Sequence, residues 1–384
     1  MQAIMAQWTS VSGWVYDQSD PFYAPDWILY FGGVAQLEKR KPVNELWSRF
    51  PRAICCGCST SGEILNGRLT DGTIVAALVK FDSVRVRAAE FILTAPDASR
   101  AAGRDVAGQL NEPDLRHVLV LGDGLLINGS QLVAGICETL GSTVTVTGGL
   151  AGGATRFART LTGLGAEVRS GQVVAIGFYG ATLRVGCGEA GGWTPFGPYR
   201  MITRSRNSVL YELDGVPALD LYKRYLGDRA AGLPATGFLF PLEVLAGMAE
   251  TNGLVRTMLA VDEAAHSLTF AGDMPEGKYV RFMKASHAGL VVGAETAAQR
   301  VVQEGRCKGD RLAILVSCVG RRIVLGLHTE EELDAAVRAL PEDCKSVGFY
   351  SYGEICPATG RVGSQLHNQT LAVTTFSEDV WKAG

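Results

Sequence analysis

From residue 27 onward, the chain alternates short apolar runs with stretches of helical periodicity. WILYFG (27–32) is apolar almost throughout, and PRAICC (51–56) becomes apolar toward its end, which is typical of buried strands. Between them, Val43, Leu46 and Phe50 recur at the spacing of one helical face. A strand, a helix and a second strand in this order normally form a parallel, right-handed unit. We therefore expect a mixed α/β fold.

A second unit with the same order begins at residue 311. RLAILVSC (311–318) predicts a strand, TEEELDAAVRAL (329–340) a helix and CKSVGFY (344–350) another strand. The first unit runs into G-C-S-T-S-G-E-I (57–64) and the second into G-F-Y-S-Y-G-E-I (348–355), so both contain G-x-x-x-x-G-E-I. Any two strand–helix–strand units look alike, but the shared motif at the same place favours an internal duplication.

This order of elements predicts two related domains, each with a mixed β-sheet flanked by helices. Material between the two units also alternates, with a further helix expected at 129–141. GDRAAGLPAT (227–236) has the glycine and proline content of a linker. We therefore place the first domain at 27–227 and the second at 228–384, with residues 1–26 as an N-terminal extension.

Composition argues against several classes of protein. Among the 384 residues, 47% are hydrophobic and the net charge is −3, so we expect no nucleic-acid partner. No apolar run approaches the roughly 18 residues of a membrane-spanning helix, and the N-terminus lacks the pattern of a signal peptide. The nine cysteines, several of them inside apolar runs, indicate buried free thiols in a reducing compartment. We expect a cytoplasmic protein without membrane insertion.

The stretch with the most reactive side chains is CCGCSTSGEI (55–64). Cys55 and Cys58 form C-x-x-C, but glycines follow in place of the helix whose dipole would stabilise a thiolate. A zinc site would need a second pair of ligands at the right spacing, which the later cysteines do not supply. Around Ser59 the sequence misses G-x-S-x-G by one residue. A thiol enzyme or hydrolase is the less favoured alternative, and we assign no catalytic residue and no metal site.

A ligand pocket is the interpretation that we favour for this stretch. Hydroxyl groups at the carboxyl end of a strand, N–H groups freed by glycine and one carboxylate make a polar end for an apolar cavity. Glu63 and Glu354 occupy the same position in the repeated motif and could each hold an ammonium group. For any single glutamate, capping a neighbouring element is the commoner role, so both interpretations stay open.

Taken together, these blocks resemble the FIST family, whose members pair an N-terminal and a C-terminal FIST domain in intracellular signal transduction. The resemblance extends from about residue 27 to residue 378. The blocks that carry it are GCSTSGEI (57–64), TGGLAGG (147–153), GGWTPFGP and MITRSRNSVLYELDGVPALDLYKRYLG (191–227), SCVGR (317–321), GFYSYGEICP (348–357) and HNQT (367–370). The chain departs from the family pattern in its extra Cys55 and Cys56, and in Gly153, where many members have an acidic residue.

The resemblance implies a sensory protein and not an enzyme. Family members are thought to bind small ligands, with amino acids among the proposals, and to work with histidine kinases, cyclic-di-GMP enzymes or chemoreceptors. One bacterial branch is similar to a haem-binding nitric oxide sensor. This chain carries no kinase, cyclic-di-GMP or methyl-accepting region, so we expect its output to lie in a separate partner protein.

The resulting hypothesis is a polar wall shared by the two related halves. Its residues are Cys58, Ser59, Thr60, Glu63, Tyr352, Glu354, His367 and Asn368. If the chain binds haem, His367 and Cys318 are the axial candidates, because haem iron takes His, Cys, Met or Tyr. The alternatives are a hydrogen-bonded histidine at a strand start and a cysteine buried for packing. We expect no other cofactor.

Overall fold

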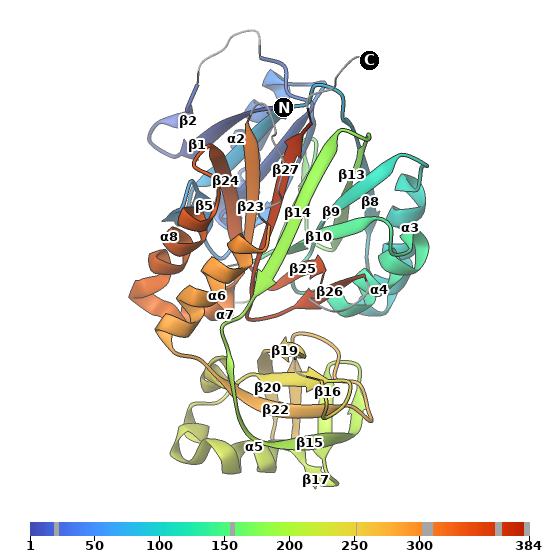
Figure 1. The fold of residues 1–384 in the computed structure, drawn as a ribbon, viewed down its shortest axis with the longest axis vertical. Coiled ribbons are helices and arrows are strands. Elements are labelled where there is room, and N and C mark those ends of the chain that lie inside the picture. Colours follow the sequence, from blue (N-terminus) through green and yellow to red (C-terminus); the bar gives the residue numbers. More distant parts are fainter. Residues whose placement is uncertain (19–22, 154–157, 251, 302–309, 358–362, 380–384) are drawn as a thin grey trace.

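Two parts make up the molecule, a body of three β-sheets and a smaller inserted unit (Figure 1). The coordinates form a computed structural model that describes residues 1–18, 23–153, 158–250, 252–301, 310–357 and 363–379. Strands before residue 191 and after residue 310 build the body, whereas residues 194–284 build the inserted unit. The N-terminus lies at the end of the body that is remote from the inserted unit.

The body consists of three copies of one series of elements. Each copy has two parallel strands joined through helix, then a short hairpin, then a strand antiparallel to the first. Copy 1 comprises β3 (Trp27–Gly32), α1 (Val34–Glu38), α2 (Lys41–Arg49), β4 (Ile54–Ser59), β5 (Glu63–Leu65), β6 (Arg68–Thr70) and β7 (Ile74–Lys80). Copy 2 comprises β9 (Leu115–Gly122), α4 (Gly129–Leu140), β10 (Thr145–Leu150), β11 (Thr162–Leu164), β12 (Glu167–Arg169) and β13 (Gln172–Tyr179). Copy 3 comprises β23 (Arg311–Cys318), α7 (Val319–Leu325), η4 (Gly326–His328), α8 (Thr329–Ala339), β24 (Cys344–Ser351), β25 (Gly353–Pro357), β26 (Ser364–His367) and β27 (Leu371–Glu378).

The remaining elements of the body extend these copies. β1 (Gln2–Thr9), β8 (Arg85–Ile92) and β14 (Leu183–Ala190) each pair with the last strand of one copy, and β2 (Gly13–Tyr16) pairs with β1. The short η1 (Pro96–Ala98) and α3 (Ser99–Leu110) lie between β8 and copy 2, and α6 (His287–Gln299) precedes copy 3. The described part of the N-terminal stretch therefore adds two strands to the sheet of copy 1.

A glycine at the same position of each copy lets the two parallel strands approach. Gly57, Gly148 and Gly348 each pair with a residue of the neighbouring parallel strand. A Cβ added at these glycines would lie 2.1, 1.9 and 2.0 Å from the backbone oxygen of that residue. Real side chains cannot make such contacts, so each copy requires glycine here.

Each copy contributes its hairpin to the sheet of another copy. β5 pairs with β24, β11 pairs with β4, and β25 pairs with β10, so the exchange is cyclic. The loops before the hairpins close a ring of three main-chain hydrogen bonds, from Ser61 N–H to the Tyr350 carbonyl (2.8 Å), Gly152 N–H to the Ser59 carbonyl (2.8 Å) and Tyr352 N–H to the Leu150 carbonyl (3.1 Å). The body is thus pseudo-threefold. Copies 1 and 3 are the related units predicted from the sequence, and copy 2 is a third that the sequence did not reveal.

Aromatic side chains from all three copies meet in the space that the sheets enclose. The ring centroids of Phe31 and Phe349 lie 4.5 Å apart, and those of Trp27 and Phe178 lie 5.0 Å apart. Aromatic pairs at these separations stabilise a core beyond the area that they bury. The centre of the body is therefore a packed hydrophobic core.

The inserted unit interrupts the connection between β14 and α6. Its elements are β15 (Thr194–Arg206), β16 (Val209–Leu213), β17 (Val216–Pro217), α5 (Ala218–Leu226), η2 (Gly227–Gly232), η3 (Ala235–Leu239), β18 (Leu242–Leu245), β19 (Leu254–Arg256), β20 (Met258–Asp262), β21 (Ser267–Phe270) and β22 (Tyr279–Lys284). The strands are antiparallel, and α5 packs Tyr222 against Phe282 with ring centroids 5.2 Å apart. The sequence-based boundary between residues 227 and 228 falls inside this unit, directly after α5.

The fold class predicted from the sequence is confirmed, because the molecule has several mixed sheets flanked by helices. None of the helices in the described ranges combines the length and the apolar character that crossing a bilayer requires.

Candidate functional site

A cavity of about 540 Å³ lies between the body and the inserted unit, and we call it the cleft cavity. Its body wall stands at or just beyond the carboxyl ends of β9, β10, β23 and β24, where α/β sheets commonly bind ligands. The body side includes Leu125, Leu150, Cys318, Val319 and Tyr352, and the side of the inserted unit includes Phe238, Thr257, Leu259 and Phe270. The volume lies within the usual range of small-molecule sites.

Two of the residues singled out in the sequence, Cys318 and Tyr352, lie in the wall of the cleft cavity. Cys318 ends β23, and Tyr352 follows β24 directly, so parallel pairing brings them to the same edge of one sheet. Burial raises the pKa of the Cys318 thiol well above its ordinary value. Cys318 is therefore a neutral, apolar part of the wall at physiological pH.

The two motif glutamates have the same contacts in copies 1 and 3. Glu63 accepts hydrogen bonds from the Thr60 hydroxyl and, at 3.0 Å each, from the N–H and hydroxyl of Thr73. Glu354 accepts from the Ser351 hydroxyl at 2.6 Å and from the N–H and hydroxyl of Thr370 at 3.2 and 2.8 Å. Each carboxyl thus fastens its loop to the start of the last strand of its copy, which is the capping role that the sequence left open.

Burial also changes the ionisation of both glutamates. It raises the pKa of Glu63 to about 7 and that of Glu354 to about 8, against the opposing effect of the donors around each carboxyl. The charged form of a buried carboxyl is disfavoured because it loses hydration. At neutral pH, Glu354 is therefore mainly protonated in the folded protein.

The other residues of the GCST block connect copies of the body. The Ser59 hydroxyl donates to the Gly152 carbonyl at 2.6 Å and accepts from Leu161 N–H at 2.8 Å, which joins copy 1 to copy 2. Cys58 lies in the central core, and burial raises the pKa of its thiol well above the ordinary value. A buried thiol that resists ionisation is a poor nucleophile. Nothing in these contacts favours the alternative of a thiol enzyme or hydrolase.

His367 of the HNQT block ends β26, and the next three residues form the loop to β27, which reaches toward the inserted unit. His367 Nε2 lies 3.0 Å from the Cys356 carbonyl, and the ring lines a second cavity of about 320 Å³. Asn368 is buried, and neither atom of its amide has a partner among the described residues. Gln369 has φ of +62° and donates from Nε2 to the Phe238 carbonyl at 3.3 Å. The structure therefore places His367 opposite Glu354 on neighbouring strands, whereas Tyr352 lines the cleft cavity and Glu63 lies in copy 1.

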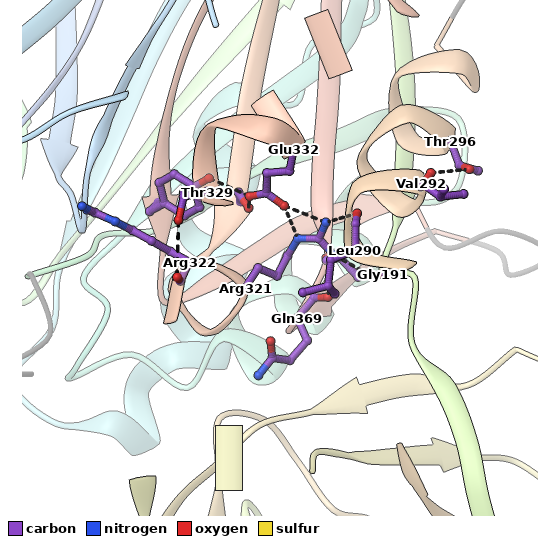
Figure 2. Close-up of polar contacts among 12 residues, drawn as sticks. Gly191, Leu290, Val292, Thr296, Arg321, Arg322, Thr329, Glu332 and Gln369 are labelled. Atoms are coloured by element: carbon purple, nitrogen blue, oxygen red, sulfur yellow. Dashed lines mark hydrogen bonds and ion pairs between the residues drawn. The ribbon is translucent and has the colours of Figure 1, made fainter. Parts of the chain in front are cut away.

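An ion pair that sequence reasoning missed, between Arg321 and Glu332, lies buried where the inserted unit joins the body (Figure 2). Arg321 Nε and Nη2 are 2.9 and 2.7 Å from Glu332 Oε2. The other carboxylate oxygen accepts from the hydroxyls of Ser317 and Tyr350 at 2.9 and 2.6 Å. With both oxygens bonded, the pair meets the condition under which a buried ion pair is tolerated.

The same guanidinium forms hydrogen bonds with both chain segments that connect the body to the inserted unit. It donates to the carbonyl of Gly191, where the chain leaves β14, and at 2.8 Å to the carbonyl of Leu290, where the chain has returned in α6 (Figure 2). Arg321 belongs to the SCVGR block, but no spacing rule pairs an arginine with a glutamate 11 residues later on another helix. We call Arg321 and Glu332 the junction pair.

Comparison with protein-family models gives two matches in tandem. The FIST N domain matches residues 26–216, and the FIST C domain matches residues 218–357. The chain belongs to the FIST family. FIST domains are associated with signal transduction and with sensing of small ligands. In this FIST protein, the first match covers copies 1 and 2, and the second runs from within the inserted unit to the end of β25.

Other comparisons add little to the FIST assignment. No curated protein matches the chain. A crystal structure of cyanuric acid hydrolase from A. caulinodans has 11% sequence identity, covers 77% of this chain and 100% of its own, and has a TM-score of 0.20. At that TM-score, the likeness says nothing about the fold or activity of this FIST protein.

The axial candidates for haem lie in separate places in this FIST protein. Cys318 lines the cleft cavity and His367 lines the second cavity. To bind iron through Nε2, His367 would have to give up its contact with the Cys356 carbonyl. Haem binding at either residue stays a prediction. Across the described ranges, no group of three or more His, Cys, Asp or Glu side chains is placed to hold a metal ion.

Proposed function

We propose that this FIST protein is an intracellular sensor that binds a small ligand in the cleft cavity and signals through a separate partner protein. The observation that carries the proposal is the cleft cavity itself, whose walls come from both parts of the molecule. A ligand that contacts both walls favours the arrangement of the two parts in which those contacts form. Ligand binding then shifts the population of arrangements that a partner encounters.

The junction pair supports this mechanism. Arg321 contacts both chain connections of the inserted unit, and Gln369 contacts the unit directly through the Phe238 carbonyl. A change in the position of the inserted unit would therefore displace Arg321. Through Glu332, it would also alter the hydrogen bonds of Ser317 and Tyr350 near the buried ends of β23 and β24. The partner class, which is a histidine kinase, a cyclic-di-GMP enzyme or a chemoreceptor, rests on the family resemblance alone.

A thermal-shift screen tests the proposal, beginning with the twenty amino acids at about 1 mM. A ligand with a Kd of about 10 μM at that concentration adds roughly 2.7 kcal/mol to the free energy of unfolding. Any compound that gives a shift is then tested on Leu259→Trp, which places an indole in the cleft cavity from a position 41% exposed. Val15→Trp, at a position 56% exposed on β2, is the matched control.

The cleft assignment requires that Leu259→Trp weakens the shift and that Val15→Trp preserves it. If both variants respond like the wild type, the ligand binds elsewhere and the assignment is wrong.

A further inference from the structure

The charged groups of the cleft cavity lie at its exposed rim. Arg100 lines the cavity, but its guanidinium contacts the Glu138 carboxylate, with Nε 3.3 Å from Oε2, and the Gln131 side-chain oxygen at 3.4 Å. Asp97 is exposed on η1. Arg100 is thus already neutralised by a neighbour, and Asp97 is already solvated.

The inner wall is apolar or neutral. Leu150, Phe238, Phe270 and Val319 supply hydrocarbon from both parts of the molecule, and Cys318 adds a thiol. Moving an ionised ammonium or carboxylate from water to such surroundings without a partner is strongly unfavourable. A ligand that fills the inner part of the cavity therefore gains from being neutral there.

One polar group in this wall lacks a hydrogen-bond partner. Thr257 lines the cavity, is 2% exposed, and its hydroxyl has no partner within the part of the chain that the structure describes. An unsatisfied buried hydroxyl destabilises a protein, so such groups are rare and call for an explanation. A χ1 rotation of about 120° carries the hydroxyl of a threonine to another staggered position and moves the methyl with it. In the complex, the Thr257 hydroxyl is to take the staggered position that faces the cavity.

Building on the proposed function, we propose that the cleft cavity takes a neutral ligand with an apolar, ring-sized body and a hydrogen-bond acceptor that receives the Thr257 hydroxyl. The hydrogen bond that the free protein lacks is then made in the complex. The unpaired hydroxyl destabilises the unbound protein, and the hydrogen bond to the ligand removes this destabilisation. A carbonyl or amide oxygen is the simplest acceptor of this kind.

The ligand class is tested by calorimetric titration of the full chain with two matched series at up to about 1 mM. On an indole ring the members are indole-3-acetamide, tryptamine, indole-3-acetate and tryptophan, and on a phenyl ring they are the corresponding amide, amine, acid and amino acid. We expect at least one amide to bind, and to bind at least tenfold more tightly than every charged member of its series. If a charged member binds as tightly as the amide, the inference of a neutral ligand is wrong and the sensor proposal stands. If no compound of any charge binds, both lose their support.

Thr257→Val tests the role of the hydroxyl both in the free protein and in binding of the amide. Because the hydroxyl is unpaired, its removal should raise the midpoint of urea unfolding of the free protein, and it should weaken binding of the amide at least fivefold. Thr257→Ser, which keeps the hydroxyl, should bind within twofold of the wild type. Tyr30→Phe is the matched control, because the Tyr30 hydroxyl is also buried without a partner among the described residues but lies in the body core. It should raise the unfolding midpoint and leave binding unchanged. Unchanged or lowered stability of Thr257→Val, or amide binding equal to that of the wild type, would overturn the assignment.

Discussion

Replacing Glu354 by glutamine should remove a specific part of the pH dependence of stability. Burial raises the pKa of this carboxyl to about 8, from an ordinary value of 4.5. Between these values the unfolded chain releases the proton and the folded chain retains it. The free energy of unfolding therefore falls as pH rises through this window, and the contribution of Glu354 is most favourable below about 4.5.

The size of the effect follows from the two pKa values. At about 1.4 kcal/mol for each pH unit, the whole interval between 4.5 and about 8 corresponds to a loss of about 5 kcal/mol. At pH 7, about 3 kcal/mol of this has been lost. Glutamine cannot ionise and has nearly the same shape, so its oxygen can accept from Thr370 while its amide donates to Ser351. The variant should keep the fold and lose only the ionisation cost.

Urea unfolding of the wild type and Glu354→Gln at several pH values between 5 and 8 measures this directly. The difference in unfolding free energy should shift in favour of the variant by about 1.4 kcal/mol per pH unit up to about pH 7.5. Glu342→Gln, at an exposed position before β24, should follow the wild type throughout. Parallel curves for Glu354→Gln and the wild type would mean that the buried carboxyl is already ionised, and the desolvation argument would then be wrong.

Three further experiments test other parts of the structure. Gly348→Ala forces a Cβ to within 2.0 Å of a backbone oxygen, so we expect loss of at least about 3 kcal/mol in urea unfolding, whereas Gly108→Ala on α3, with open space around its Cβ, should stabilise by about 0.5–1 kcal/mol. Arg321→Leu or Glu332→Leu alone should lower the free energy of unfolding by about 3–5 kcal/mol, and the double variant should lose less than the sum of the two; additive losses would show that the pair does not act as a unit. Added haem should give no Soret shift that depends on His367; a shift abolished by His367→Ala would establish haem binding there.

The repeated motif made part of the fold predictable. G-x-x-x-x-G-E-I marks copies 1 and 3 because both fasten a loop with a glutamate three residues after a hydroxyl. In copy 2, the carboxylate that bonds the start of the last strand is that of Asp123. Asp123 follows β9 and accepts a hydrogen bond from Gly171 N–H at 2.8 Å, just before β13. The carboxylate comes from a different strand, so the motif is absent although the topology is the same. The feature of copy 2 that the sequence shares with the other copies is Gly148 of TGGLAGG, the glycine that lets the two parallel strands approach.

Sequence reasoning could identify residues of the cleft cavity only where they lie at the end of a predicted strand of the body. The sequence proposed Tyr352 for a polar wall and Cys318 as a haem ligand, and both lie at the carboxyl ends of parallel strands in the wall of the cleft cavity. Thr257 and Phe238 were not predictable, because they reach the cavity only through the placement of the inserted unit. The hydroxyls and carboxylates of the GCST and GEI blocks proved to be bonded to their own loops and neighbouring copies, a distinction that residue type alone does not carry.

Because the hairpins are exchanged between copies, two of the three sheets of the body cannot be completed during synthesis until strands far along the chain have been made. When the chain has been made as far as residue 227, the sheet of copy 1 already has β11 and β12, but that of copy 2 lacks β25 and β26. The sheet of copy 3 then has only β14, β5 and β6 of its six strands. Unpaired strand edges are templates for wrong pairing. The growing chain therefore carries an open edge on β10 until residues 353–357 have been made, and any chain that stops earlier keeps that edge.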